Sequence, residues 1–600
     1  MLTERLTPVV VCLAFALSAN AQDSLLLRDY QFVKRSDPWL TTQNAAALVR
    51  YTGRSIAEAE LSLTKTNGGL TNFDGSPNAL QADAAVESFF RLSPRTVVFG
   101  AMSYSNFSGK DMAGSAFIPT ASPTGLATVR AGCQAGLATV RGGSSAGLAT
   151  VRAGSPASLA HHPFDLVEDS LTNTGTKHLD TYRLAGGFGY RVADGFAVGA
   201  RLDYTAANYA KYKDLRHQNK LMDLQLTAGI YVPLATWLQA GAHYLYHRNT
   251  ESVLFSTFGK TDRVYKTLID YANFTGPVEQ FGADGYTDRS REMPLVNDYN
   301  GGGANFSLLI SHFSFYNAFT YAHRRGYYGR KSPYTITYTD HASHCYGYDA
   351  RLTHEMSRAR QYIELHLQAE NLQNNAATYR EQQNDAGAAY YEYYTPVKTA
   401  NKVWVNGTVS YTLDIFSGQR FQGLQQGKQS LEASPTTPHW EAWPTMTVQA
   451  GLNWLHRKQT VYLYPYARRQ RLTVYESFVS LCRNIIDAKT SAIWSFALDA
   501  SFRTGTGEPY EDFPLNAIET TVPDTPVPTM EAYLWREYQW LTAAQYQIGG
   551  TVKYAFKLKS LPSVLPYVKA TLSHRKANQT FEYSNGRDRT TAAIALGCTF

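Results

Sequence analysis

Residues 182–204 read YRLAGGFGYRVADGFAVGARLDY. Apolar and aromatic side chains occupy most alternate positions between Tyr182 and Val192, and again between Phe196 and Tyr204. Arginine, aspartate, glycine and alanine stand between them. A period of two residues is typical of a β-strand with one apolar face, and VADG at 192–195 is typical of the turn between two strands. The stretch therefore predicts an antiparallel hairpin.

The same alternation returns in 222–232 and 238–246. A soluble β-sandwich would also show it, but three features favour a membrane barrel. The strands have about 12 to 18 residues, where globular strands have 3–10. Their apolar faces carry Tyr, Phe or Trp near both ends, and short turns alternate with long connections. Because only helices and closed barrels satisfy every backbone polar group in lipid, we expect a closed barrel with its polar face inward.

We predict an all-β, transmembrane, antiparallel up-and-down barrel of about 16–18 strands, closed by a C-terminal strand that ends in Phe600. The predicted strands are 55–66, 79–92, 94–108, 178–193, 194–208, 219–233, 235–249, 301–311, 313–327, 337–354, 360–376, 400–415, 443–457, 470–484, 488–504, 541–557, 564–578 and 589–600. An even number places both chain ends in the periplasm. The segment 416–442 is long although it falls on the side of the short turns, so sixteen strands are an alternative.

The last strand reads RTTAAIALGCTF, and Ile594, Leu596 and Phe600 share one face. This pattern resembles the C-terminal signal of Gram-negative outer-membrane barrels, and the chain as a whole resembles a porin-like family of such barrels. The resemblance implies insertion by the barrel-assembly machinery, with these three residues as the assembly signal. Outer-membrane lipid is then expected to surround the barrel.

Residues 1–21 have the features of a signal peptide: Arg5 near the start, an apolar run over 9–17, and Ala-Asn-Ala at 19–21. We therefore expect export to the outer membrane. After residue 21 the chain has no run of 18 or more apolar residues, so no transmembrane helix is expected. The net charge of +7 is spread along the chain, which predicts no nucleic-acid partner.

Residues 22–54 precede the barrel, which we assign to 55–600. Receptors that couple to an energy-transducing partner carry a plug several times this size and about 22 strands, so that class does not fit. A short hatch inside the lumen does fit a segment of this length. QNAAAL at 43–48 resembles the Asn-Pro-Ala region of the long-chain fatty-acid transporter family, although it departs from that motif at the proline. A hydrophobic-compound transporter with an N-terminal hatch is therefore one alternative function.

Residues 125–157 contain three near-identical blocks of eleven residues, rich in glycine. Glycine disfavours a helix, so we expect an exposed loop within the long outer connection 109–177. Further long outer loops are expected at 251–300 and 505–540. Since loop-closure entropy rises slowly with length, removing 121–160 is expected to leave folding and conductance intact.

A barrel of this size encloses an aqueous channel. The charged side chains at inward positions are of both signs, which argues against strong selectivity for one sign of ion. The predicted lumen-lining residues are Arg183, Arg191, Arg201, Asp203, Asp223, Asp349, Arg351, Glu364, His366, Glu370, Asp499 and Arg503.

His341, His344 and Cys345 are types of residue that bind zinc, but adjacent strand residues point to opposite faces. We predict no metal site. Glu364, His366 and Glu370 could form an acid–base row, yet a polar lumen produces such rows by default. We predict no cofactor and no enzyme activity.

The sequence favours a channel or uptake pore for small solutes. A surface-binding or adhesion protein that acts through its outer loops is the second alternative, because loops often carry function.

Overall fold

The computed structural model describes residues 29–72, 75–112, 164–167, 175–211, 217–255, 265–269, 278–281, 293–332, 335–416, 444–487, 492–515, 522–527, 529, 531–558, 564–583 and 586–600. The predicted signal peptide (1–21) and the repeats (125–157) lie outside these residues and stay predictions.

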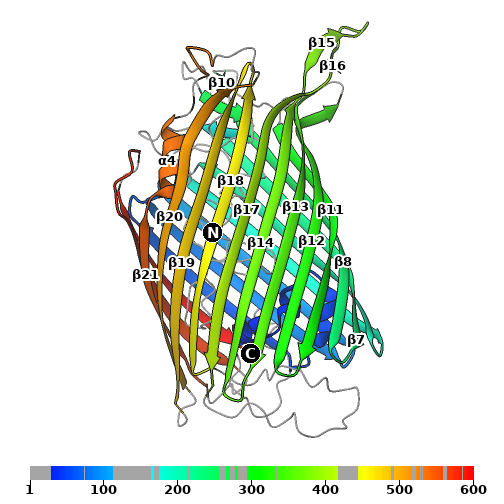
Figure 1. Cartoon of the computed structure of the whole chain (residues 1–600), viewed down its shortest axis with the longest axis vertical. Helices are drawn as coiled ribbons and strands as arrows, with labels where there is room; N and C mark the ends of the chain where they lie inside the picture. The colour runs from blue at the N-terminus through cyan, green and yellow to red at the C-terminus, as the bar shows by residue number, and fades with distance from the viewer. Residues whose placement is uncertain are drawn as a thin grey trace.

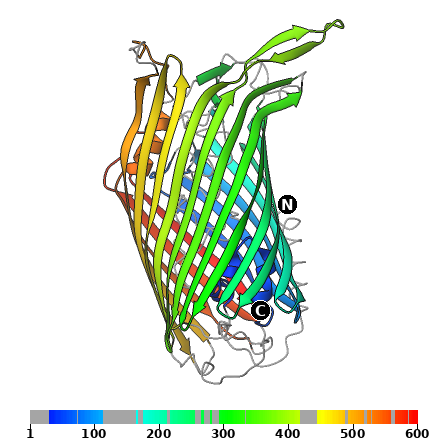
Figure 2. The same ribbon diagram turned by 45° about the vertical axis from the view of Figure 1, so that its right-hand side comes forward.

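Eighteen antiparallel strands form one closed sheet (Figure 1, Figure 2). Each strand pairs with the next along the chain, and the last pairs with the first, with Leu61 opposite Leu596. The prediction of an all-β up-and-down barrel is confirmed, with the higher of the two strand counts. The strands are β1 (Ile56–Asn67), β2 (Asn78–Ser93), β3 (Thr96–Met112), β5 (Gly175–Ala193), β6 (Phe196–Lys211), β7 (His217–Ala235), β8 (Leu238–Phe255), β11 (Met293–Ile310), β12 (Phe313–Ser332), β13 (Thr335–Glu355), β14 (Ala359–Ala376), β17 (Val397–Ile415), β18 (Met446–Leu463), β19 (Tyr466–Asp487), β20 (Ala492–Pro514), β21 (Gln545–Ala555), β22 (Leu565–Ala577) and β23 (Asp588–Thr599).

The two faces of the sheet differ in the side chains they carry. Leu184 and Ile594 point outward and are 49% and 62% exposed, whereas Arg201 points inward and is 7% exposed. Apolar groups therefore cover the outside and polar groups fill the inside, the reverse of a soluble barrel. The alternation in the sequence has this physical origin.

Most of the two- and three-residue turns between strands lie at one end of the barrel, which we call the turn end; the turn at 464–465, between β18 and β19, lies at the opposite end. Those at the turn end lie at 94–95, 194–195, 236–237, 311–312 and 356–358. β1 begins and β23 ends there, at the bottom of Figure 1. Ala57 and Phe600 exchange two backbone hydrogen bonds of 2.8 and 3.0 Å, so the last residue completes the closure. Ile594 and Leu596 point outward on β23 and are more than half exposed.

The opposite end, which we call the loop end, carries the smaller elements. β4 (Phe164–Val167), β9 (Tyr265–Ile269) and β10 (Val278–Phe281) form a three-stranded sheet. β15 (Tyr379–Gln383) and β16 (Ala389–Tyr393) form a hairpin that projects beyond the barrel, at the top right of Figure 1.

The helix α4 (Glu531–Thr542) precedes β21. Most of α4 lies in the segment 505–540, which was predicted to be an outer loop. Its last residues occupy the start of the predicted strand 541–557, so the observed strand, β21, begins only at Gln545. β20 continues ten residues past its predicted end at 504, to Pro514. Of the helices in the described part of the chain, none is long and apolar enough to cross a membrane.

Candidate functional site

Residues 29–55, which we call the lumenal segment, lie inside the barrel near the turn end (Figure 1, Figure 2). The segment contains α2 (Tyr30–Ser36), η1 (Pro38–Thr41) and η2 (Ala45–Arg50). Each begins after a side chain that accepts a hydrogen bond from the backbone of its first turn: Asp29, Asp37 and Asn44 respectively. Such caps satisfy the N–H groups that a short helix leaves free, so the segment folds into three compact turns.

The apolar side chains of the lumenal segment pack against the inner wall. Trp39 lies edge-on to both Tyr231 and Tyr316, with ring centroids 5.2 and 5.3 Å apart. Its indole N–H donates to Ser307 Oγ at 2.6 Å. A second buried cluster contains Tyr30, Val33, Leu40, Leu48, Tyr51, Ile56, Phe89, Val97 and Phe99. The segment is thus wedged between β1–β3 on one side and β7–β12 on the other.

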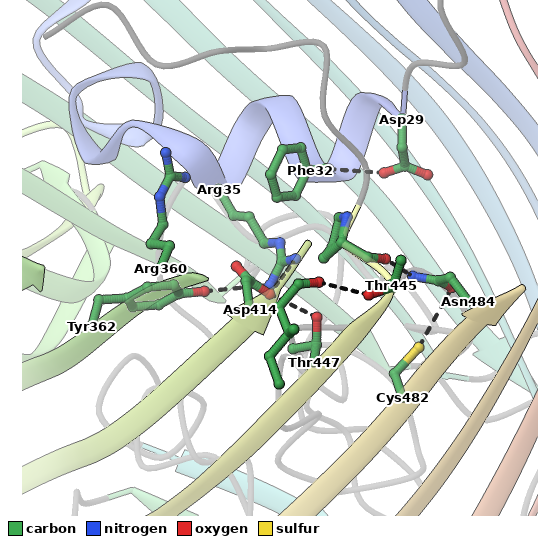
Figure 3. Close-up of polar contacts among 12 residues, drawn as sticks. Asp29, Phe32, Arg35, Arg360, Tyr362, Asp414, Thr445, Thr447, Cys482 and Asn484 are labelled. Carbon is green, nitrogen blue, oxygen red and sulfur yellow. Dashed lines mark hydrogen bonds and ion pairs between the residues drawn. The ribbon is translucent and has the colours of Figure 1, made fainter. Parts of the chain in front are cut away.

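An ion pair fastens α2 to a third part of the wall (Figure 3). Arg35 Nη2 lies 3.1 Å from Asp414 Oδ1, and its Nη1 donates to Tyr362 Oη at 3.3 Å. Thr447 donates to the same aspartate at 2.6 Å. Burial lowers the pKa of Arg35, but Asp414, Tyr362 and Asp29 together raise it by more, so the pKa lies above its usual value. The guanidinium is therefore charged at any physiological pH.

Further polar anchors extend around the barrel. Lys34 Nζ lies 2.8 Å from Glu87 on β2, and Asp29 lies 3.4 Å from Lys553 on β21. Arg351 on β13 donates to the carbonyl of Arg35 at 2.7 Å. Contacts thus run from β1 through β17 and reach β21, so the segment crosses the lumen.

Four glycines let the lumenal segment approach the wall closely, and we call them the glycine seat: Gly189, Gly199, Gly229 and Gly241. Gly189, Gly199 and Gly229 stand opposite one another on β5, β6 and β7. A Cβ at Gly189 would lie 2.8 Å from the Ala45 carbonyl oxygen, and one at Gly241 would lie 2.7 Å from Asn44 Nδ2. Any side chain here would overlap the segment.

A cavity of about 340 Å³ lies between the lumenal segment and the loop end. The segment supplies its floor through Lys34, Arg35, Pro38 and residues 41–43. Inward side chains of β7, β8, β11–β14, β17 and β18 supply its wall. Tyr316, Arg351 and Tyr362 belong both to this wall and to the contacts that hold the segment. The wall contains Gln225, His243, His247, Tyr299, Asn305, Tyr316, Asp349, Arg351, Tyr362, Glu364, His366, Glu370, Trp404 and Gln449.

The helix α4 occupies another part of the lumen, nearer the loop end. Glu537 accepts two hydrogen bonds from Arg457 of β18, at 3.0 and 3.1 Å, and both side chains are fully buried. Arg503 of β20 donates to the carbonyl of Trp540 at 2.8 Å. The helix is therefore held by charged groups of the wall.

Some of the predicted lumen residues meet at the cavity, namely Asp349, Arg351, Glu364, His366 and Glu370. Arg351 stands opposite Glu364 and lies 2.7 Å from it, and Asp349 stands opposite His366 at 2.7 Å. Glu370 lies 2.9 Å from Arg324. Each of these residues is therefore paired within the wall.

The other predicted lumen residues lie elsewhere. Arg183 and Arg201 lie 3.1 and 2.6 Å from Asp203, and Asp223 lies 2.8 Å from His247. The remaining three are Arg503 beside α4, Asp499 half-buried on β20, and Arg191, whose backbone N–H donates to Arg95 at 2.8 Å near the turn end.

His341, His344 and Cys345 do not converge. His341 donates to or accepts from Asn297 at 2.6 Å in the buried wall, whereas His344 pairs with Tyr321 on the outer face at 2.9 Å. Among the described residues no group of three or more His, Cys, Asp and Glu side chains could hold a metal ion.

Sequence reasoning missed Lys34, Arg35 and Gln43 of the floor. His243 and Asn305 are also absent from the predicted lumen-lining residues, and the sequence gave no sign that they share one cavity with the lumenal segment. That convergence depends on where the segment lies, which periodicity cannot report.

The model of a family of unknown function (DUF6850) matches residues 171–600, and the chain belongs to this family. None of the curated proteins matches the chain. Solved structures similar to it include the ferric preacinetobactin receptor BauA from Acinetobacter baumannii, with 8% identity over 90% of this chain and 80% of that chain and a TM-score of 0.33. The copper transporter OprC has 8% identity over 91% and 80%, with a TM-score of 0.30. The ferric citrate transporter FecA in its unliganded form has 8% identity over 91% and 78%, with a TM-score of 0.34. Identities and scores this low carry no information about substrate.

Proposed function

We propose that this member of the DUF6850 family is an outer-membrane uptake channel for small polar solutes, and that its lumenal segment is a hatch that must move before a solute passes. The proposal describes a transporter and assigns no catalytic step to the chain.

The exterior of the barrel supports a membrane location. Apolar side chains such as Phe188, Leu202 and Leu498 lie 46%, 41% and 64% exposed on its outer face. In water such a surface would aggregate, whereas in lipid it is the stable arrangement for a closed barrel. The predicted signal peptide is consistent with export to that membrane.

The observation that carries the proposal is the position of the lumenal segment. It crosses the lumen near the turn end and contacts the wall on several sides, through the Trp39 cluster, the Arg35–Asp414 pair and the glycine seat. A cavity with polar walls lies directly on it. In the proposed route, a solute enters from the loop end, reaches the cavity and meets the segment.

The attachment of the segment suits a movable part. The chain at residues 51–55 ties it covalently to β1, and its contacts with the rest of the described wall are side-chain packing, hydrogen bonds and ion pairs. Each such contact contributes about 0.5–1.5 kcal/mol, or more where charge is buried, so the segment can detach while the strand ladder stays intact.

The lining of the cavity distinguishes between solutes. Its wall carries histidine, arginine, aspartate, glutamate and amide side chains together with Tyr299 and Trp404. Burying unpaired polar groups against a hydrocarbon is unfavourable, so the cavity favours a polar solute over a hydrophobic one. This argues against the hydrophobic-compound transporter.

A surface-binding role is the second candidate, and the β15–β16 hairpin favours it. The hairpin projects beyond the barrel, and its Tyr379, Tyr393 and Tyr394 are 38%, 39% and 51% exposed. Aromatic side chains on a projecting element are frequent in binding surfaces.

Solute flux into proteoliposomes tests the proposed function. We expect slow swelling with the full chain and fast swelling with a variant that lacks residues 29–54. A variant that lacks 379–394 serves as the control, because this deletion leaves the lumen unchanged. Each barrel is first checked for the gel shift between unboiled and boiled samples. Equal swelling by the full chain and the 29–54 deletion would refute the hatch, and loss of flux in the control would favour the surface role.

A further inference from the structure

The outer face of the β18–β19 hairpin changes in character from the turn end to the loop end. The two strands lie side by side (Figure 1), and their register sets outward side chains opposite one another. Tyr475, Val479 and Leu481 point outward and are 43%, 49% and 42% exposed. From the turn end, successive outward pairs are Val448–Leu481, Ala450–Val479, Leu452–Ser477, Trp454–Tyr475, His456–Thr473 and Lys458–Arg471. The face is therefore apolar first, then aromatic, and finally basic.

The aromatic pair marks the edge of the apolar band. Aromatic girdles flank the lipid-facing band of a membrane barrel at both interfaces. Trp454 and Tyr475 form such an edge, since the outward pairs between them and the turn end are mostly apolar. Lys458 is four residues farther along β18, about 13 Å at about 3.3 Å per residue, and a strand tilt of about 40° reduces the height to about 10 Å. The basic pair thus lies beyond the hydrocarbon, at the level of lipid headgroups.

Lys458 and Arg471 are two like charges in direct opposition. Both are exposed, and in the described part of the chain neither side chain forms an ion pair or a hydrogen bond. Like charges directly opposite on neighbouring strands destabilise a sheet, because their Cβ atoms are only about 4.5–5.5 Å apart. The pair therefore favours an anion that both cations can reach.

Neighbouring acids do not neutralise this pair. On β17 the residue opposite Lys458 is a valine. Arg469, the next outward residue of β19, forms an ion pair with Glu511 of β20 at 2.9 Å. Glu508 of β20 stands opposite Arg471, on the side away from Lys458, and forms no ion pair with the arginine. Among the described residues, Lys458 is therefore left without a counter-charge on either neighbouring strand.

Trp454 provides an apolar surface next to the cations. Its indole ring lies against Gly407 of β17, where an added Cβ would overlap the ring. The glycine therefore lets the ring lie close to the sheet, with Tyr475 opposite it on β19. Aromatic rings at a membrane interface contact the upper part of the acyl chains, whereas Lys and Arg attract anionic headgroups. The two kinds of group are in the order that a lipid standing along the wall requires.

We propose that Lys458 and Arg471 bind the phosphate group of an anionic lipid in the leaflet at the loop end, with Trp454 and Tyr475 against its acyl chains. A phosphate has several acceptor oxygens, so the arginine can bind it through two N–H groups while the lysine adds a point charge. The lipid relieves the repulsion between the two cations and so stabilises the barrel. The proposal rests on the proposed function only in taking the barrel to lie in a membrane, and it is independent of the hatch because the site is on the outer face.

Native mass spectrometry of the purified full chain in neutral detergent tests the site. The probes are phosphatidic acid and phosphatidylcholine with the same acyl chains, and inorganic phosphate is the competitor. We expect phosphatidic acid to bind at least tenfold more tightly than phosphatidylcholine and to bind less as salt is raised, because salt screens exposed charges. An equal concentration of inorganic phosphate should not displace it. Equal binding of the two lipids would overturn the proposal, and displacement by phosphate would show a site for the free anion instead.

Variants with a matched control locate the site. We expect the double variant Lys458→Gln, Arg471→Gln to bind phosphatidic acid at least tenfold more weakly. Lys220→Gln is the control, because Lys220 is also exposed on the outer face of β7 near the loop end but has Asn208 and Ser252 opposite it. Unchanged binding in the double variant, or an equal loss in the control, would contradict the assignment.

A charge reversal separates loss of the site from loss of the fold. Lys458→Glu replaces the repulsion by an ion pair with Arg471. We expect this variant to lose selective binding of phosphatidic acid, while its folded gel band without added lipid survives to the wild-type temperature or higher. A lower temperature would contradict the repulsion, and retained selectivity would contradict the site. Equal swelling by the full chain and the 29–54 deletion would refute the hatch alone, whereas failure of phosphatidic acid to bind would refute this site alone.

Discussion

Substituting Gly189 with alanine should loosen the lumenal segment without altering the barrel. The three atoms nearest an added Cβ all belong to the segment: the Ala45 oxygen at 2.8 Å, the Val49 nitrogen at 3.1 Å and the Ala46 oxygen at 3.2 Å. Ordinary contact begins near 3.4 Å, so the backbone of η2 has to retreat by about 0.6 Å, the difference between 2.8 and 3.4 Å. The strand itself is free to keep its place.

Such a retreat stretches the hydrogen bonds that hold this part of the segment. Asn44 Nδ2 donates to the Ile230 carbonyl at 2.9 Å, and Thr227 Oγ1 donates to the Gln43 carbonyl at 2.8 Å. Losing two neutral bonds of about 1 kcal/mol each destabilises the docked state by about 2 kcal/mol. Since each 1.4 kcal/mol is a factor of ten, the undocked population should rise about thirtyfold.

Single-channel recording in a planar bilayer measures this population as the open probability. We expect Gly189→Ala to raise it about thirtyfold, and Gly189→Leu to raise it further. Gly186→Ala on the same strand is the control, because the nearest atom to its added Cβ lies 3.9 Å away. If Gly189→Leu leaves a correctly folded barrel as closed as the wild type, the account of the glycine seat is refuted.

Three further predictions concern the anchors and the closure of the barrel. Arg35→Met leaves the buried Asp414 with Thr447 as its donor and should raise the open probability in the same bilayer assay. Adding Asp414→Asn should lower the open probability part of the way back to the wild-type value. No such recovery would mean that loss of the ion pair is not the cause. Arg457→Met breaks the buried pair with Glu537 and should destabilise the protein by about 3–5 kcal/mol, seen as a lower temperature for loss of the folded gel band; an unchanged temperature would contradict this. Phe600→Asp places a charge where the last strand meets Ala57 and should sharply reduce the amount of protein in the outer membrane, measured by fractionation, whereas normal assembly would show that the terminal aromatic is incidental.

Sequence alone predicted the strands because an apolar outer face and a polar inner face impose a period of two on the middle of each strand. Where the outer face is no longer apolar, the pattern disappears. This explains why β20 continues to Pro514 through GTGEPYEDFP, and why β11 begins at Met293, eight residues before its predicted start.

The sequence of α4 carries a helical pattern, although most of it was predicted to be a loop. Its buried residues are Tyr533, Leu534, Arg536, Glu537, Trp540 and Leu541, which recur every three to four positions as on one face of a helix. Most of this region was instead predicted to belong to the outer loop 505–540, and Arg536 and Glu537 interrupt its apolar residues. Their buried partners on β18 and in the connection after β1 become visible only when the lumen is assembled.

The candidate site was predictable only in part. Alternation places Arg351, Glu364 and His366 inward, but the pairing of Arg351 with Glu364 depends on the register of β13 and β14. Likewise, the alternation along the strand places His243 inward but does not show that it lies near Gln43, which comes 200 residues earlier in the chain. Strand periodicity fixes the direction of a side chain, whereas the neighbours across the lumen follow from closure of the barrel.

The central claim is that the lumenal segment must leave its place for a solute to pass, and a reversible tether tests it most directly. A Cβ at Gly241 would lie 2.7 Å from Asn44 Nδ2, so the two Cβ atoms in the pair Asn44→Cys and Gly241→Cys are at most about 5 Å apart, close to disulfide range. With this pair placed in the Gly189→Ala background, we expect oxidation to close the channel and reductant to reopen it, while either cysteine alone has no such response. Conductance that persists after complete formation of the disulfide would contradict the account.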